Sequence, residues 1–255
     1  MITLTTDFGS SEYVGTMKGV IYSLCPKAKI VDISHSIKKF DIRHAAYILH
    51  SSASYFPKGT VHCVVVDPGV GTKRKGVIIK TKEYIYVGPD NGVFSLVGGI
   101  DKVIEIASQA KSKTFHGRDV FAPVAAKLAC GAGIEEFGKE IKSIKRMIGG
   151  AKIEKNAISG EVICIDSFGN VITNICEKLV KKGKIKHNNF IDLRMKGKKH
   201  RIKFAESYGF AAKNELICLI GSAGYLEIAV NQDDAGRLLC VKGGEKVEVT
   251  KCVGC

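Results

Sequence analysis

The chain has 255 residues, of which 45% are hydrophobic and 25% are charged, and its formal net charge at pH 7 is +14. These values are ordinary for a folded globular protein, so they exclude collagen-like, disordered and membrane-embedded classes. The length suits one large domain or two smaller ones. The chain begins without the features of a secretory signal and contains no stretch of spanning length, so we expect a cytoplasmic protein with no membrane partner.

The first half alternates short apolar segments with amphipathic ones, which is typical of an α/β fold. We expect strands at residues 2–6, 29–33, 61–66, 77–79, 84–87 and 103–106. We expect helices at residues 14–24 and 41–55, and a third that begins at 118 and ends at Gly131. Segment 61–66 is a continuous apolar run, of the kind that a parallel sheet buries on both faces. These patterns predict a Rossmann-like domain with a central, largely parallel sheet.

The second half lacks long helical patterns. Apolar periodicity fades near residue 148, and short β-rich segments then recur between turn residues. They lie at residues 161–165, 189–193, 216–220, 226–230 and 246–250. This pattern predicts a smaller all-β domain, a barrel or a sandwich. We therefore expect an N-terminal α/β domain over 1–147, a linker over 148–156 and a C-terminal β-barrel domain over 157–255.

Much of the positive charge lies between Lys178 and Lys203, in lysine-rich stretches with few aromatic residues. A strongly basic protein can bind nucleic acid. Because these stretches interrupt strand-like segments, we interpret them as solvated loops and expect no nucleic-acid partner.

The nine cysteines are odd in number and scattered, and most lie in apolar segments. We interpret them as buried thiols of a protein in a reducing compartment. Cys252 and Cys255 form a lone CxxC at the end of the chain, and without a second pair we expect neither a metal site nor a redox site there.

Two acids follow expected strands of the sheet. In open α/β sheets the ligand crevice lies beyond the carboxyl ends of the strands, where Asp7 follows the first strand and Asp67 the third. Asp67 opens the run Asp-Pro-Gly-Val-Gly-Thr-Lys-Arg, whose proline and glycines permit a tight loop that folds Arg74 back towards Asp67. Spacing alone leaves a structural ion pair and a functional pair as equal alternatives.

Three further motifs carry polar groups. His116 lies in Phe-His-Gly-Arg-Asp just before a helix, and Gly117 allows close approach of a ligand. A structural histidine is the plainer alternative. Residues 166–170 and 221–224 form polar turns that, taken singly, are an ordinary hairpin and an ordinary loop. Fingerprints for dinucleotides and triphosphates are absent from the sequence.

Together these motifs resemble the S-adenosylmethionine hydrolase (hydroxide adenosyltransferase) family, which is related to S-adenosylmethionine-dependent fluorinases and chlorinases. Seven motifs occur in the same order over nearly the whole chain. They are Thr-Asp-Phe-Gly, Phe40-Asp41, Val-Asp-Pro-Gly-Val-Gly, Gly-Pro-Asp-Asn-Gly, Phe-His-Gly-Arg-Asp, Asp-Ser-Phe-Gly-Asn and Gly-Ser-Ala-Gly-Tyr-Leu-Glu-Ile-Ala. The resemblance implies that water attacks ribose C5′ of S-adenosylmethionine and releases adenosine and methionine.

The resemblance also implies a set of site residues, with Asp67, Arg74 and His116 around the attacking water. The implied substrate-binding residues are Asp7 at the ribose hydroxyls, Phe40 as a pocket wall, Asn170 and Tyr208 at the adenine, Asp166 at the methionine ammonium, Ser222 near its carboxylate, Glu227, and Val230 and Gln232 near the adenine edge. The family encloses its ligand between domains of neighbouring subunits, which implies a homotrimer. Neither a cofactor nor a metal is implied.

Competing hypotheses differ in the nucleophile or in whether turnover occurs. Halogenases carry an aromatic residue at the position of Asp67 and a serine at that of Gly117, so the present pattern favours water over a halide. Glu12 stands where the family pattern has aspartate, and Ala223 where halogenases have arginine, so the contacts to the amino-acid end are the least determined. The hypotheses that compete with the hydrolase are a same-fold halogenase, a non-catalytic S-adenosylmethionine- or adenosine-binding protein and a basic RNA-binding protein.

Overall fold

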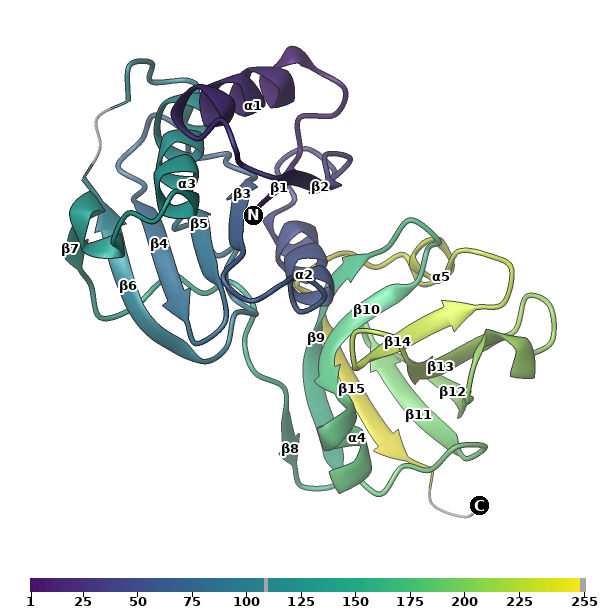
Figure 1. Cartoon of the computed structure of the whole chain (residues 1–255). Helices are drawn as coiled ribbons and strands as arrows, with labels where there is room; N and C mark the ends of the chain where they lie inside the picture. The colour runs from purple at the N-terminus through teal and green to yellow at the C-terminus, as the bar shows by residue number, and fades with distance from the viewer. Residues whose placement is uncertain (108–109, 253–255) are drawn as a thin grey trace. The chain divides into compact units, whose positions relative to one another are not determined.

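The computed structural model describes residues 1–107 and 110–252, and the chain divides into two compact units, Met1–Met147 and Ile148–Cys255 (Figure 1). The expected linker, residues 148–156, belongs to the second unit. Part of it forms strand β8 (Lys152–Glu154), which pairs antiparallel with β9 (Ala157–Ile165). Residues 152–154 of the expected linker are therefore part of a sheet.

The first unit contains a seven-stranded sheet in the order β2-β1-β3-β5-β4-β6-β7. Its strands are β1 (Ile2–Thr6), β2 (Ile30–Ser34), β3 (Val61–Val65), β4 (Gly76–Thr81), β5 (Ile85–Pro89), β6 (Ile100–Ile106) and β7 (Gly138–Glu140). The first four in spatial order pair in parallel, and the remaining pairings are antiparallel. The predicted α/β class with a largely parallel sheet is confirmed.

Helices pack on both faces of this sheet because alternate strand residues point to opposite sides. The helices of this unit are α1 (Glu12–Leu24), α2 (Ile42–Ala53), the π-helical turn η1 (Gly117–Phe121) that continues into α3 (Ala122–Ala129), and the short 3-10 helix η2 (Ile134–Phe137). One core cluster joins Leu4 and Val65 to residues of α1 and α3. The other joins Val64 and Val66 to residues of α2.

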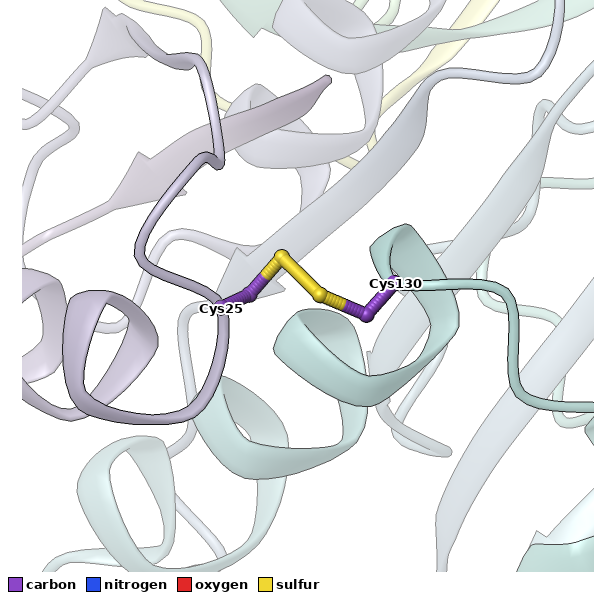
Figure 2. Close-up of a disulfide and its surroundings, with 2 residues drawn as sticks. All are labelled: Cys25 and Cys130. Carbon is purple, nitrogen blue, oxygen red and sulfur yellow. A yellow bond between two sulfur atoms is a disulfide. The ribbon is translucent and has the colours of Figure 1, made fainter.

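A disulfide joins Cys25, which follows α1, to Cys130, which follows α3, with their Cα atoms 6.1 Å apart (Figure 2). The expectation of free thiols is wrong for these two residues. The reason is tertiary: α1 and α3 pack in one cluster on the same face of the sheet, so their ends meet. Cys63 and Cys218 are buried free thiols, as expected. In the terminal CxxC, Cys252 is buried, and Cys255 lies outside the described residues.

The second unit is a closed seven-stranded barrel. Its sheet runs β10-β14-β13-β12-β11-β15-β9-β8, and an additional pairing of β10 with β9 closes the ring and leaves β8 outside it. The remaining strands are β10 (Val171–Cys176), β11 (Phe190–Met195), β12 (Lys198–Phe204), β13 (Leu216–Ile220), β14 (Tyr225–Val230) and β15 (Lys246–Lys251). Short helices α4 (Glu177–Lys182), η3 (Tyr208–Phe210) and α5 (Ala235–Leu239) lie in the connections. The predicted barrel is confirmed.

The lysine-rich stretches are only partly the loops that we expected: Lys184 and Lys186 lie in a connection without regular structure, but other lysines lie in a helix and a strand. The first begins in α4, and the second turns at Gly197 and enters β12. Along β12, Ile202 and Phe204 are buried while Lys199 and Arg201 are exposed. A strand on a barrel needs apolar residues only on its inner face, so charge on the outer face does not oppose strand formation.

Among the described residues, no helix combines the length and the apolar character that crossing a membrane requires.

Candidate active site

The loop after β3 carries two of the implied catalytic residues. Val70 N–H donates to the carbonyl of Asp67 at 3.2 Å, and Thr72 N–H donates to the carbonyl of Gly69 at 3.2 Å, so two successive turns reverse the chain. Gly71 has a φ of +76°, and a Cβ atom there would collide with the carbonyl oxygen of Lys113. Glycine is therefore required both by the backbone conformation and by the close approach of the neighbouring loop.

These turns bring Arg74 onto Asp67 as a bidentate ion pair. Arg74 Nε donates to Asp67 Oδ1 at 3.0 Å, and Nη2 donates to Oδ2. Nη1 donates to the carbonyl of Lys75 at 2.9 Å, and the guanidinium lies 5.3 Å from the ring centre of Phe121. The two charged side chains are only 8% and 5% exposed. The expected contact between Arg74 and Asp67 is present. Its two parallel, charge-assisted hydrogen bonds fix the relative orientation of the two groups.

His116 contacts the same guanidinium from another element. It immediately precedes η1, and its Nδ1 lies 3.0 Å from Arg74 Nη2. A guanidinium has donors and no acceptors, so Nδ1 accepts this hydrogen bond. The proton of the neutral ring is therefore on Nε2. We assign this tautomer from the hydrogen-bond partner.

The pKa values of the two titratable groups move in opposite directions. Burial raises the pKa of the Asp67 carboxyl, while the charge and hydrogen bonds of Arg74 act to lower it. Burial also lowers the pKa of His116, and the charge of Arg74 lowers it further. The result is an aspartate of increased basicity beside a neutral imidazole, an arrangement suited to accepting a proton.

Asp7 and Phe40 lie together although 33 residues separate them in sequence. Asp7 directly follows β1, and its Oδ2 accepts a hydrogen bond from the Phe40 backbone N–H at 2.8 Å. Phe40 has a φ of +68°, a conformation that is rare for a bulky residue, and its side chain is 64% exposed. The hydrogen bond holds a strained residue with its ring in solvent, which is typical of a functional position.

A cavity of about 620 Å³ lies within the first unit, and Asp7, Phe40, Asp67 and His116 all contribute to its wall. This volume is in the range of about 300–1,000 Å³ that small-molecule sites occupy. Arg74 is absent from the lining, so it stands behind Asp67 and His116. Four of the five implied site residues of this unit therefore share one cavity.

The sequence did not single out an aromatic cluster on this wall. Phe8, Tyr13 and Phe115 contact one another edge to face, with ring centres 5.0–5.9 Å apart, and all three line the cavity. Phe8 is adjacent to Asp7 in sequence and Phe115 is adjacent to His116, so the sequence motifs gave a signal for these two aromatic residues. Tyr13 had none, because only packing of α1 against the loop before η1 brings it there.

The second unit holds a separate network of implied substrate-binding residues. Asp166 accepts hydrogen bonds from the backbone N–H of Phe168 and from both the backbone and the side chain of Asn170, at 2.9–3.0 Å. The Asn170 side chain also lies 3.4 Å from the hydroxyl of Tyr208. That hydroxyl donates to Glu227 Oε2 at 2.7 Å. Four implied residues thus form one hydrogen-bonded chain.

Glu227 is only 4% exposed, and burial raises the pKa of its carboxyl despite the hydrogen bond from Tyr208. A Cβ atom at Gly221 would overlap this carboxyl group, so glycine makes the space for it. The remaining implied residues take no part in the network among the described contacts. Ser222 and Gln232 are exposed, Gln232 has a φ of +63°, and Val230 is buried on β14.

Comparison with known families assigns both units. The SAM hydroxide adenosyltransferase N-terminal domain matches residues 2–138, and the SAM hydroxide adenosyltransferase C-terminal domain matches residues 160–248.

The similarity to individual relatives extends over nearly the whole chain. A protein of Methanocaldococcus jannaschii named (R)-S-adenosyl-L-methionine hydrolase is 43% identical, over 98% of this chain and 95% of its own. A fluorinase of an Actinoplanes species is 27% identical, over 98% of this chain and 97% of its own. The crystal structure of an uncharacterized conserved protein from Thermotoga maritima superposes with a TM-score of 0.89 at 39% identity, covering 98% of this chain and 100% of that one.

Proposed function

The chain belongs to the SAM hydroxide adenosyltransferase family, and from this membership we propose that it hydrolyses S-adenosyl-L-methionine by attack of water at ribose C5′, releasing adenosine and L-methionine. The name of the Methanocaldococcus jannaschii relative specifies the (R) sulfonium epimer, and we propose the same epimer as the substrate here.

One observation carries this proposal: a buried carboxylate, a guanidinium and an imidazole are in continuous contact, and the carboxylate and the imidazole line a cavity. A halide nucleophile fits this wall poorly, because the Asp67 carboxylate repels an anion and Gly117 offers no hydroxyl group. Water fits it, since a carboxylate can accept the proton that water must lose.

The proposed step forms the bond between the water oxygen and C5′ while the C5′–S bond breaks. The electron pair of that bond goes to sulfur, which leaves as a neutral thioether, so no general acid is needed. Asp67 accepts the water proton. A positioned base of this kind typically increases the rate by about 10²–10⁴-fold. The Nε2–H group of His116 holds the water in line behind C5′, at about 3–3.5 Å. Arg74 holds the Asp67 carboxylate and the His116 imidazole in place.

Substrate capture is assigned to local acids. The substrate is cationic at sulfur and the protein has a net charge of +14, so the overall field opposes its approach. We assign Asp7 to the ribose hydroxyls and Phe40 to the pocket wall, which the cavity supports. In the barrel unit we assign Asn170 and Tyr208 to the adenine and Asp166 to the ammonium group, which their shared network supports.

The remaining assignments concern the outer contacts and the assembly. Ser222 is assigned to the methionine carboxylate, Glu227 to the same binding surface, and Val230 and Gln232 to the adenine edge. We propose a cytoplasmic homotrimer in which the first unit of one subunit and the barrel unit of its neighbour enclose the substrate. The proposed chemistry uses no cofactor and no metal.

The test is the reaction in ¹⁸O-labelled water with each sulfonium epimer. We expect label on the 5′-oxygen of adenosine, and faster conversion of the (R) epimer. Label in a free ribose product would point to glycosidic cleavage and would refute attack at C5′. Formation of 5′-chloro-5′-deoxyadenosine in chloride would identify a halogenase, and intact substrate after prolonged incubation would identify a binding protein without turnover.

A further inference from the structure

Positive charge is concentrated in one short part of the barrel unit. Between Lys178 and Lys203 the chain has eleven lysines and arginines and one acidic residue, Asp192. The proposed hydrolysis does not use this charge, because its substrate is itself cationic. Six of these eleven cations lie on β11, β12 and the turn between them.

The strands order this charge into a stripe on the outside of the barrel. We define the basic stripe as Arg194, Lys196, Lys199, Arg201, Lys203 and Lys246. On β12, Lys199 and Arg201 are exposed and Lys203 is half-buried, while Ile202 and Phe204 are buried. Outward residues of a strand repeat every two positions, so these three cations recur about every 7 Å.

Neighbouring strands widen the stripe. Arg194 of β11 lies opposite Lys199, and β15, which carries Lys246, pairs with the other edge of β11 (Figure 1). At this end the surface is hollowed by about 570 Å³, and Arg194, Lys196, Lys199 and Lys246 line the hollow with a single acid, Glu248.

The stripe is only partly neutralised by acids of the chain. Lys199 pairs with Asp192 at 2.8 Å, and Lys196 lies 3.8 Å from Glu245. Within residues 1–107 and 110–252, neither Arg194 nor Lys246 forms an ion pair. Fixed cations of this density attract an anionic partner that carries several charges.

An aromatic group lies at the other end of the stripe. Phe190, opposite Lys203 on β11, is 40% exposed, and the Arg201 guanidinium lies 5.2 Å from its ring centre. Surfaces that bind single-stranded nucleic acid combine a cationic track for the backbone with aromatic or guanidinium planes on which bases stack.

We propose that the basic stripe binds the phosphate backbone of single-stranded nucleic acid, with a base stacked at Phe190 and Arg201. The expectation of no nucleic-acid partner rested on the lysines lying in irregular loops. On β12 they form instead a regular row, whose spacing suits the successive phosphates of an extended strand.

The test is fluorescence anisotropy of a labelled single-stranded RNA of about 20 nucleotides, in about 50 mM and about 200 mM salt. We expect binding of micromolar order at the lower salt concentration. In the triple variant Arg194→Gln/Lys199→Gln/Arg201→Gln, affinity at low salt should fall at least about tenfold. The slope of log K against log salt should fall by about 2, since each single-strand phosphate contact contributes about 0.7.

The matched control is Lys27→Gln/Lys127→Gln/Lys142→Gln, which removes the same charge from exposed positions of the first unit. An equal loss of affinity in the control would overturn the proposal, as would absence of binding by the parent protein at low salt. Equal or tighter binding of a duplex of the same length would overturn the assignment to single strands. Hydrolysis of S-adenosylmethionine at the parental rate verifies folding, and Arg194→Gln alone should show a smaller loss in the same direction.

Discussion

Arg74 contacts both other members of the proposed catalytic set, Asp67 and His116, and does not line the cavity. Of its five N–H groups, two bind Asp67, one binds His116 and one binds the carbonyl of Lys75. The guanidinium is therefore committed to protein partners. It fixes the orientation of the carboxylate and selects the tautomer of the imidazole, so we propose for Arg74 a positioning role that acts through these two side chains.

Replacing the carboxylate of Asp67 by an amide tests its role as proton acceptor. In Asp67→Asn we expect kcat to fall by about 10²–10⁴-fold, since an amide cannot take the water proton, while KM changes little. Asp7→Asn is the matched control on the same cavity wall, and it should mainly raise KM. Steady-state kinetics of both variants provide the measurement. Parental turnover in Asp67→Asn would remove the proposed role.

The pH profile of kcat/KM reports on the same group. A base works only when ionised, so activity should fall as pH drops through the pKa of Asp67, which burial places above the ordinary aspartate value. Arg74 lowers this pKa, so Arg74→Gln should move the acidic limb to higher pH. An unchanged limb in folded Arg74→Gln would show that another group titrates. Loss of the limb in His116→Gln would assign it to the imidazole.

At the scale of elements, the disulfide ties together the ends of α1 and α3. Tyr13 near the start of α1 and His116 just before η1 both line the cavity, so the bond lies at the ends of α1 and α3 that are remote from the cavity. A crosslink between residues 105 apart reduces the conformational entropy of the unfolded chain by a large amount.

Removing this crosslink should lower the free energy of unfolding by about 2–4 kcal/mol in Cys25→Ser/Cys130→Ser, measured by urea denaturation. The parent protein in reductant should lose a similar amount, whereas the variant should not respond to reductant. Cys218→Ser, which removes a buried free thiol, is the control. Its free energy of unfolding should still fall in reductant, because it retains the disulfide. Equal stability of the oxidised parent and the double variant would contradict a stabilising role.

Sequence patterns predicted the elements that local chemistry determines. The proline and glycines after Asp67 anticipated its contact with Arg74, because turn geometry decides a contact between residues seven apart. The pairing of Cys25 with Cys130 was out of reach, since it depends on two helices packing on the same face. Strand β12 was missed because only Ile202 and Phe204 mark its inner face, too short a run to outweigh its lysines.

At the scale of the whole molecule, the implied site residues fall into two groups on separate units. Asp67, Arg74 and His116 belong to the first unit, and Asp166 and Glu227 belong to the barrel unit. Each group is internally connected by hydrogen bonds. The proposed trimer assigns the two groups that enclose one substrate molecule to different subunits, which makes the assembly testable by mixing variants.

Asp67→Asn disables the first unit, and Asp166→Asn should weaken the binding surface of the barrel unit, so each homotrimer should be impaired. If the two variants are unfolded together, refolded and assembled at equal concentration, about a quarter of the sites should combine an intact first unit with an intact barrel unit from its neighbour. Activity should therefore recover to about a quarter of the parental value, whereas variants mixed without exchange should show only the sum of their residual activities. Sedimentation analysis should give a trimer. Recovery that never exceeds the sum of the separate activities would place both groups of one site in a single subunit.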